Sequence, residues 1–355
     1  MIEEARTNLK LWSERIEVDF SRIRSDIIEN AIVSPYGTQT ADGMVPSSTT
    51  VSSKYIDKVL TGFSASQNVC TSAFFKKGVG RDVWLQIYEE SGNAYHGVQF
   101  NFETEELTFR NSNEYTSGNG ITTDYGFEKY PNGWYRLWIA GYPNTTTTGR
   151  RIRIRLTNQT GSLDFSGDGI SSYLYVWGVQ CEIGSFPTSY IPTQGSTRTR
   201  AADNAKITGK NFSEWYRQDE GTFFVDAAEP SAFVAYQAYL TLQGASITDE
   251  IRIWRLNLTT ATFNHLLNNA TQGVINLVIN TIANKIARSY SLAQGIVGSA
   301  NGGSNVQATL SSTTPVTSLR IGARGNNTFY GNRTYKRIAY YPKRLPNSQL
   351  QALTR

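Results

Sequence analysis

The chain is poor in the residues that build disulfide and metal sites. Its 355 residues include two cysteines, Cys70 and Cys181, and two histidines, His96 and His265. Two cysteines form neither a disulfide framework nor a four-ligand zinc site, so we expect buried free thiols. The histidines are far apart in the sequence and have no metal-ligand spacing. The composition therefore argues against a disulfide-stabilised scaffold and against a sequence-encoded zinc site.

Long apolar runs and helical repeats are also missing. No apolar run approaches the roughly 20 residues that a membrane span needs. The acidic start MIEEARTNL lacks the basic flank and the apolar core of a secretion signal. No heptad, collagen-like or solenoid period occurs. We therefore expect a protein that is synthesised in the cytoplasm and does not insert into a membrane.

Acidic residues are absent from the last third of the chain. No Asp or Glu occurs from Ile251 to Arg355, a stretch with 12 Lys and Arg. Residues 1–200 hold 19 basic against 21 acidic residues, whereas residues 201–355 hold 15 against 8. The basic half has no groove-reading helix and no recognised motif, so we do not expect nucleic acid as a partner. Its charge indicates either a solvated face or an acidic partner.

Strand patterns dominate what is present. The run RIRIRL at 151–156 alternates strictly, so its three arginines should face outward and its three aliphatic residues inward. WYRLWI at 134–139 reads as a central strand, and IRIWRLNL and SLRIGA repeat such patterns in the second half. Turns rich in Gly, Asn and Ser separate these runs. The pattern predicts an all-β protein with two tandem antiparallel β-sandwich (jelly-roll) domains, at residues 1–183 and 210–355.

A short apolar segment lies between these two predicted domains. Residues 184–209 contain Gly184 and Pro187, which break regular elements, but also aromatic and aliphatic side chains that a free linker would lack. We therefore predict an ordered connector in which Phe186, Tyr190 and Ile191 clamp the two domains together.

Signals of enzymatic chemistry are missing. The acidic run Glu103–Glu106 lies between two strand-like runs and reads as a solvated hairpin turn rather than a catalytic carboxylate pair. No nucleophile elbow, catalytic triad order or phosphate-binding loop is present. We therefore predict a non-enzymatic protein without a cofactor. One alternative stays open, a calcium ion at Asp164 and Asp168 in DFSGDG, where Asp/Gly turn formation is the other interpretation.

Several segments carry a family resemblance. EEARTNL, SPYGTQTADGM, NGWYRLWI, the segment DFSGDGISSYLYVWGVQCEIGSFPTSYIPT and RTRAAD resemble landmarks of a module of bacteriophage tail-fibre and minor virion proteins, which is similar to a carbohydrate-binding jelly roll. In the second half, GTFFVDAAEP and LRIGARGNNTFYGNRTYKRIAYYPKRLPNSQLQAL resemble a laminin-G or concanavalin-like jelly roll. The resemblance covers nearly the whole chain.

The resemblance implies a virion protein of the tail that attaches the phage to its host through surface glycans. The alternative is an architectural protein that decorates the head or the tail without binding a receptor. We expect a homotrimer, with other tail proteins and bacterial surface polysaccharide or lipopolysaccharide as partners. The predicted glycan-binding residues flank the turn RGNNTFYGN: Arg324, Tyr330, Arg333 and Lys336.

Other aromatic residues are candidates for stacking on sugar rings, although we expect most of them in the cores. They are Trp84, Tyr95, Trp134, Trp138, Tyr173, Tyr175, Trp254 and Tyr335.

Overall fold

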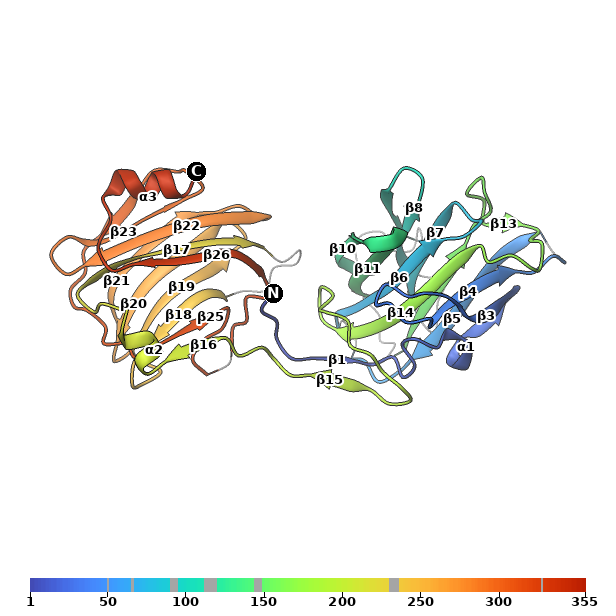
Figure 1. Ribbon diagram of the computed structural model, residues 1–355, viewed down its shortest axis with the longest axis horizontal. Coiled ribbons are helices and arrows are strands. Elements are labelled where there is room, and N and C mark those ends of the chain that lie inside the picture. The colour runs from blue at the N-terminus through green and yellow to red at the C-terminus, as the bar shows by residue number, and fades with distance from the viewer. Residues whose placement is uncertain are drawn as a thin grey trace. The chain divides into compact units, whose positions relative to one another are not determined.

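A computed structural model of the chain confirms the all-β prediction, with antiparallel strand pairs in every sheet (Figure 1). The structure describes all residues except 50, 65–66, 90–94, 112–119, 144–148, 230–235 and 327. The chain divides into two compact units. The N-terminal unit is Arg6–Arg200, and the C-terminal unit is Ala201–Arg355 together with Met1–Ala5.

The N-terminal unit contains two large sheets. The six-stranded sheet has the order β10 (Gly120–Tyr130), β11 (Trp134–Pro143), β6 (Val69–Lys77), β14 (Leu174–Ile183), β4 (Ala41–Pro46), β3 (Ser25–Ile32). The seven-stranded sheet has the order β13 (Asp164–Phe165), β5 (Ser52–Leu60), β12 (Arg150–Leu156), β7 (Asp82–Glu89), β8 (Tyr95–Asn101), β9 (Glu106–Asn111), and β2 (Ser21–Ile23) also pairs with β5. The short helix α1 (Ile16–Asp19) precedes β2, and a 3₁₀ turn, η2 (Pro131–Gly133), joins β10 to β11.

The core of this unit consists of the inward-facing side chains of both sheets. In β12, Ile152, Ile154 and Leu156 are buried, as the alternation of RIRIRL predicts. They share this core with aliphatic residues of β11, such as Leu137 and Ile139. In the seven-stranded sheet, burial of one side of each strand leaves the other side for polar side chains.

The ends of the N-terminal unit are paired with each other, and this changes the predicted domain limits. β1 (Arg6–Asn8) forms an antiparallel ladder with β15 (Arg198–Arg200). Residues 184–200 therefore belong to the first unit, whereas residues 201–209 and Met1–Ala5 belong to the second. The structure differs here from the prediction of one separate connector at 184–209, because strand pairing between distant segments cannot be read from local sequence.

The C-terminal unit also has two sheets. The six-stranded sheet has the order β16 (Lys206–Thr208), β25 (Ser318–Ile321), β18 (Gln237–Gln243), β19 (Glu250–Asn257), β20 (Thr260–Leu267), β21 (Ala270–Val278). The five-stranded sheet has the order β24 (Val306–Ala308), β23 (Gly295–Ala300), β22 (Ala283–Ser291), β17 (Glu220–Ala228), β26 (Thr334–Tyr341).

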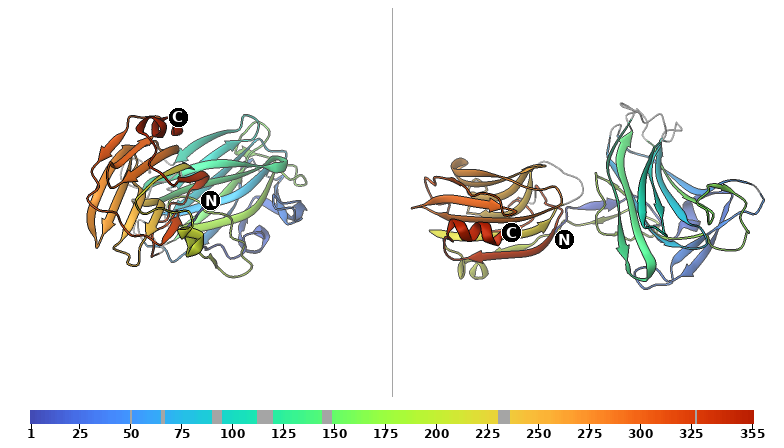
Figure 2. Two further views of the ribbon diagram at one scale, coloured as in Figure 1. Left: turned by 60° about the vertical axis from the view of Figure 1, so that its left-hand side comes forward. Right: turned by 90° about the horizontal axis from the view of Figure 1, so that it is seen from above.

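Two short helices belong to this unit. The helix α2 (Lys210–Ser213) follows β16 and buries Phe212 in the core between the sheets. The helix α3 (Asn347–Leu353) lies against β22 and β23 (Figure 2), where Leu350 packs on Phe224 and Ala287. Among the described residues, no helix has both the length and the apolar character to cross a membrane.

Candidate functional site

The outer face of the seven-stranded sheet carries arginines and aromatic rings in register. Leu85 of β7 faces the core, so its neighbours Trp84 and Gln86 face outward. The ladder between β12 and β7 places three pairs side by side: Arg155 with Trp84, Arg153 with Gln86, and Arg151 with Tyr88. We call this surface the arginine–aromatic face and define it by Tyr55, Asp57, Trp84, Gln86, Tyr88, Tyr95, Gly97, Gln99, Arg110, Arg151, Arg153 and Arg155.

Arg153 is the fixed centre of this face. Its guanidinium carbon lies 4.0 Å from the ring centroid of Tyr55 and 4.2 Å from that of Tyr88. Its Nη2 donates to Asp57 Oδ2 at 2.9 Å, and Nη1 of Arg151 donates to the same oxygen at 3.2 Å. A guanidinium group that is held between two rings and paired with a carboxylate has little side-chain entropy left to lose when a ligand binds. Arg153 is therefore preorganised.

Three polar groups in this surface have no hydrogen-bond partner among the described residues. Gln86 is fully buried, and neither its Oε1 nor its Nε2 is bonded. The same holds for Trp84 Nε1 and Arg153 Nε. Gly97 lies opposite Gln86, and a Cβ at that position would come within 2.7 Å of Gln86 Cγ. The absence of a side chain at Gly97 thus gives Gln86 the space that it occupies, and the atoms without a partner are buried.

A chain of hydrogen bonds positions the edge of the face at β9. Arg110 Nε donates to Gln99 Oε1 at 3.0 Å, and Gln99 Nε2 donates to Asp82 Oδ2 at 2.6 Å. The backbone N–H of Asp82 in turn donates to Thr157 Oγ1 at 2.9 Å. Arg110 thereby lies with its guanidinium carbon 5.6 Å from the ring centroid of Trp84. These bonds fix the orientation of an otherwise exposed arginine.

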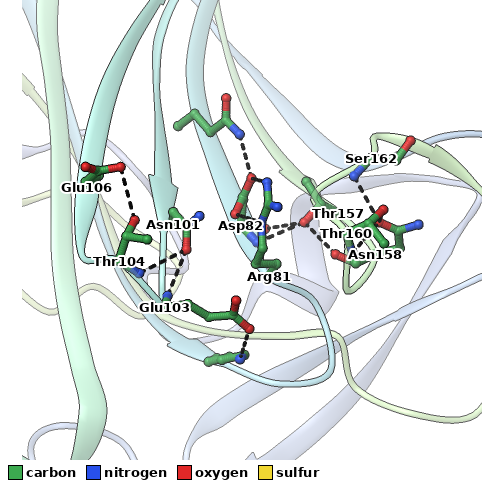
Figure 3. Close-up of polar contacts among 12 residues, drawn as sticks. Arg81, Asp82, Asn101, Glu103, Thr104, Glu106, Thr157, Asn158, Thr160 and Ser162 are labelled. Carbon is green, nitrogen blue, oxygen red and sulfur yellow. Dashed lines mark hydrogen bonds and ion pairs between the residues drawn. The ribbon is translucent and has the colours of Figure 1, made fainter.

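Side-chain caps hold the turns next to this edge (Figure 3). Asn101 Oδ1 accepts a hydrogen bond from the N–H of Glu103 at 2.8 Å, and Asn158 Oδ1 accepts one from the N–H of Ser162 at 2.9 Å. The turn at 101–106 confirms the turn predicted for Glu103–Glu106. Glu103 pairs with Lys77 at 2.8 Å, and both side chains are largely exposed, as expected for a solvated turn.

The arginine–aromatic face is suited to an acidic, ring-shaped ligand. Its four arginines are accompanied by the carboxylate of Asp57 and, at its edge, by that of Asp82, which accepts a hydrogen bond from Gln99. Arginine binds carboxylate or phosphate through two parallel hydrogen bonds, and aromatic rings offer flat surfaces to sugar rings. Burial raises the pKa of Tyr95, with the neighbouring Tyr88 acting in the same direction, so its hydroxyl stays a hydrogen-bond donor at neutral pH.

The prediction for Arg333 is wrong, because this side chain is buried. None of the Arg333 side chain is exposed. Its Nη1 donates to Glu229 Oε1 at 3.1 Å, and its guanidinium carbon lies 3.7 Å from the ring centroid of Tyr239. Glu229 is far from Arg333 in the sequence, which is why the charge pattern around the turn did not reveal the pair. Arg333 therefore stabilises the C-terminal unit and is closed to a glycan.

The other three predicted glycan-binding residues lie in different surroundings. Arg324 is half-buried, and its Nε donates to Glu250 Oε1 at 3.0 Å. Tyr330 is half-buried as well, and burial raises its pKa, while the charge of Arg320 opposes this shift. Lys336 is exposed on β26 of the five-stranded sheet, whereas Glu250, the partner of Arg324, belongs to β19 of the six-stranded sheet. A binding role for Arg324, Tyr330 and Lys336 stays a prediction.

The three residues of the predicted clamp pack within the N-terminal unit. Phe186 and Ile191 are buried. Tyr190 lies with its ring centroid 4.7 Å from that of Trp177, and its hydroxyl donates to Glu14 Oε1 at 3.0 Å. Tyr190 packs against the cluster of Phe74, Trp134 and Trp177 in the six-stranded sheet, and the guanidinium carbon of Arg6 lies 5.0 Å from the ring centroid of Phe186. A clamp between the units stays a prediction.

The Asp164–Asp168 segment has the bonding of a turn. Asp168 Oδ1 accepts hydrogen bonds from the N–H groups of Ile170 at 3.0 Å and Ser171 at 2.9 Å. A hydrogen bond with the Ser171 side chain, together with these backbone bonds, lowers the pKa of Asp168. Among the residues that the structure describes, no group of three or more His, Cys, Asp or Glu could hold a metal ion. The hydrogen bonds of Asp168 are those of an aspartate-capped turn.

Both cysteines and both histidines are buried, as expected for structural residues. Burial raises the pKa of the Cys181 thiol to about 12, although its hydrogen bond with Thr71 opposes the shift. Burial and the neighbouring charge of Arg150 lower the pKa of His96 to about 3. At neutral pH these groups are a neutral thiol and a neutral imidazole.

Sequence reasoning missed most of the arginine–aromatic face. Trp84 and Tyr95 were candidates for sugar stacking, but we expected most aromatic residues in the core, and the structure places these two outside it. The run DVWLQIYE does contain a usable signal. Its alternation sets Trp84, Gln86 and Tyr88 on one side of a strand, as RIRIRL does for its arginines.

Comparisons with known proteins yield similarity in structure only. No family model matches the chain, and no curated protein matches it. The CBM40 module of Ruminococcus gnavus IT-sialidase, solved with α2,3-sialyllactose, aligns over 42% of this chain and 91% of the module, with 14% identity and a TM-score of 0.36. The same module with α2,6-sialyllactose aligns over 42% of this chain and 92% of the module, with 13% identity and a TM-score of 0.36.

A second kind of structure spans both units. Domains LG4-5 of the mouse laminin α1 chain align over 86% of this chain and 92% of their own length, with 11% identity and a TM-score of 0.27. These identities and TM-scores are too low for a ligand to be transferred to this chain.

Proposed function

We propose that this chain is a non-enzymatic bacteriophage virion protein of the tail that contributes to host attachment by binding acidic surface glycans. The observation that carries the glycan-binding part is the arginine–aromatic face, where Arg153 is held between Tyr55 and Tyr88. Arg110 and Arg155 lie beside the ring of Trp84 on the same face. The virion part rests on the sequence resemblance to tail-fibre and minor virion proteins. We further propose synthesis in the host cytoplasm, incorporation into the tail as a homotrimer, and contact there with other tail proteins.

Each part of the face has a role in this proposal. Arg155 and Arg110 would bind the carboxylate or phosphate of the glycan, since Arg155 is half-buried and Arg110 is exposed. Trp84 lies within 6 Å of both guanidinium groups and would stack on the adjacent sugar ring.

Binding of the full-length protein to purified host surface polysaccharide tests the proposal. Arg155→Gln should weaken binding by about tenfold or more, because a hydrogen bond to a charged group contributes about 1.5–3 kcal/mol. Arg155→Lys should keep the salt dependence but lose affinity, since an ammonium cannot form the two parallel bonds. Trp84→Ala should weaken binding by a factor that salt does not change.

Matched controls lie elsewhere in the same unit. Arg22→Gln and Tyr125→Ala alter an exposed arginine and an exposed aromatic residue outside the face and should leave binding unchanged. A protein that binds no polysaccharide even at about 0.05 M salt, where charges are screened least, contradicts the glycan-binding proposal. If virions that lack this protein are then unstable or misassembled, the architectural alternative holds.

A further inference from the structure

The C-terminal unit contains a cleft of about 820 Å³ beside β16, which we call the Lys206 cleft. Its volume lies within the range of small-molecule binding pockets. Two basic residues line it, Lys206 and Arg320, and no Asp or Glu is among its lining residues. Hydroxyl and amide side chains make up much of the remaining wall, among them Thr208, Ser213 and Gln243.

Strand register places these groups in two rows on the outer side of the sheet. Lys206 of β16 lies directly opposite Arg320 of β25. In the next row, Thr208 lies opposite Ser318, and Ser318 lies opposite Gln243 of β18. The residues between the rows, such as Leu319, face the core. The sheet therefore presents two cations side by side, with hydroxyls and an amide one step along the strands.

Lys206 and Arg320 are like charges that lie opposite each other on neighbouring strands. Like charges directly opposite each other on neighbouring strands repel. Arg320 Nη1 binds the neutral amide oxygen of Asn204 at 3.0 Å. The Lys206 ammonium has no hydrogen bond or ion pair among the described residues, and neither do the side-chain polar groups of Thr208 and Gln243.

Two carboxylates lie near the cleft, and each accepts a backbone hydrogen bond. Asp249 packs beside Gly244 of the wall, but its Oδ1 accepts a hydrogen bond from the N–H of Asn268 at 2.7 Å. Asp203 precedes β16 and accepts one from the N–H of Glu3 at 2.9 Å. Neither carboxylate is among the residues that line the cleft, so an anion that enters it meets Lys206 and Arg320 first.

We propose that the Lys206 cleft is a second glycan-binding site and that it takes a saccharide unit carrying a phosphate or a carboxylate. The acid group lies between Lys206 and Arg320, and the sugar hydroxyls bond to Thr208, Ser213 and Gln243. The cleft is large enough for a whole sugar ring, and it is larger than a free phosphate ion would need. This site uses residues of the C-terminal unit alone, so it does not depend on the arginine–aromatic face.

Titration of the full-length protein with glucose 1-phosphate, glucuronic acid, glucose and inorganic phosphate tests this assignment. We expect either glucose 1-phosphate or glucuronic acid to bind at least tenfold more tightly than glucose, because a bond to a charged group adds that much affinity. The tighter of the two identifies the acid group. Lys206→Gln should weaken this binding by about tenfold, and Gln243→Ala should weaken it as well.

Lys343→Gln is the matched control, because it removes an exposed lysine of the same unit that does not line the cleft. It should leave the titration unchanged, and all variants should keep the thermal unfolding of the parent protein. Equal binding of glucose and glucose 1-phosphate overturns the proposal, as does equal binding of inorganic phosphate and glucose 1-phosphate. Binding that survives Lys206→Gln but is lost in Trp84→Ala overturns it too, while leaving the arginine–aromatic face as a glycan site.

Discussion

Replacing Glu229 with glutamine tests whether the basic residues around the RGNNTFYGN turn are structural. Glu229 is fully buried and accepts hydrogen bonds from Arg255 Nη1 and Arg333 Nη1, each at 3.1 Å. It also accepts bonds from the hydroxyl of Tyr239 and from Asn284 Nδ2. The structure thus gives two buried guanidinium groups the same carboxylate as their ion-pair partner.

The cost of the Glu229→Gln change follows from burial. At most 1% of either arginine side chain is exposed, so water cannot solvate the charge that is left uncompensated. Removing one partner of a buried ion pair costs about 3–5 kcal/mol. For a unit of this size, about 1 kcal/mol shifts the melting temperature by about 2–4 °C, so the C-terminal unit should melt about 6–20 °C lower.

Calorimetric unfolding measures this shift, because each unit has its own core and should give its own transition. Arg333→Met should destabilise the same transition, since it removes a cation from the same cluster. Lys336→Met, three positions further along the chain, should change stability by less than about 0.5 kcal/mol. If Glu229→Gln costs less than about 1 kcal/mol, the buried-pair reasoning for Arg333 is refuted.

Two further predictions concern pH and assembly. Burial raises the pKa of Asp42 to about 7, while the N–H groups of Asn30 and Ile16 oppose this shift. Because this pKa lies above the ordinary value of 3.8, the contribution of Asp42 to stability is complete below about pH 4 and is lost as the pH rises through about 7. Asp42→Asn should flatten this dependence in urea unfolding, and an unchanged pH profile would contradict the assignment. The proposed homotrimer should show about three times the chain mass of 39.5 kDa in light scattering, and a monomer mass would exclude it.

Local pattern was sufficient for the strands and their buried sides. RIRIRL predicted β12 with its aliphatic residues inward. Successive side chains of a strand point to opposite faces of the sheet, so a strictly alternating run has one apolar face, and that face is the one that can be buried. The turn at Glu103–Glu106 could also be predicted from local sequence. The residues that form it, from the capping Asn101 to Glu106, lie within six positions of the chain.

The same local reasoning failed where contacts cross long stretches of the chain. Arg333 and Glu229 are separated by 104 positions, so the sequence around Arg333 showed an exposed basic turn rather than a buried ion pair. Phe186 and Ile191 had the composition of an interface, but what they contact depends on the strand β14 and on the first residues of the chain, which fold beside them.

The sequence by itself determined the all-β class, the sidedness of strands such as β12 and β7, and the excess of positive charge in the second half. Only the tertiary structure decided which strands became neighbours. The ladders of β5, β12 and β7 bring Tyr55, Arg153 and Tyr88 together from three separate segments. The pairing of β16 with β25 sets Lys206 opposite Arg320. Alternation fixes which way a side chain points, but the partner across a ladder depends on the register of distant strands, which is set by the packing of the whole core.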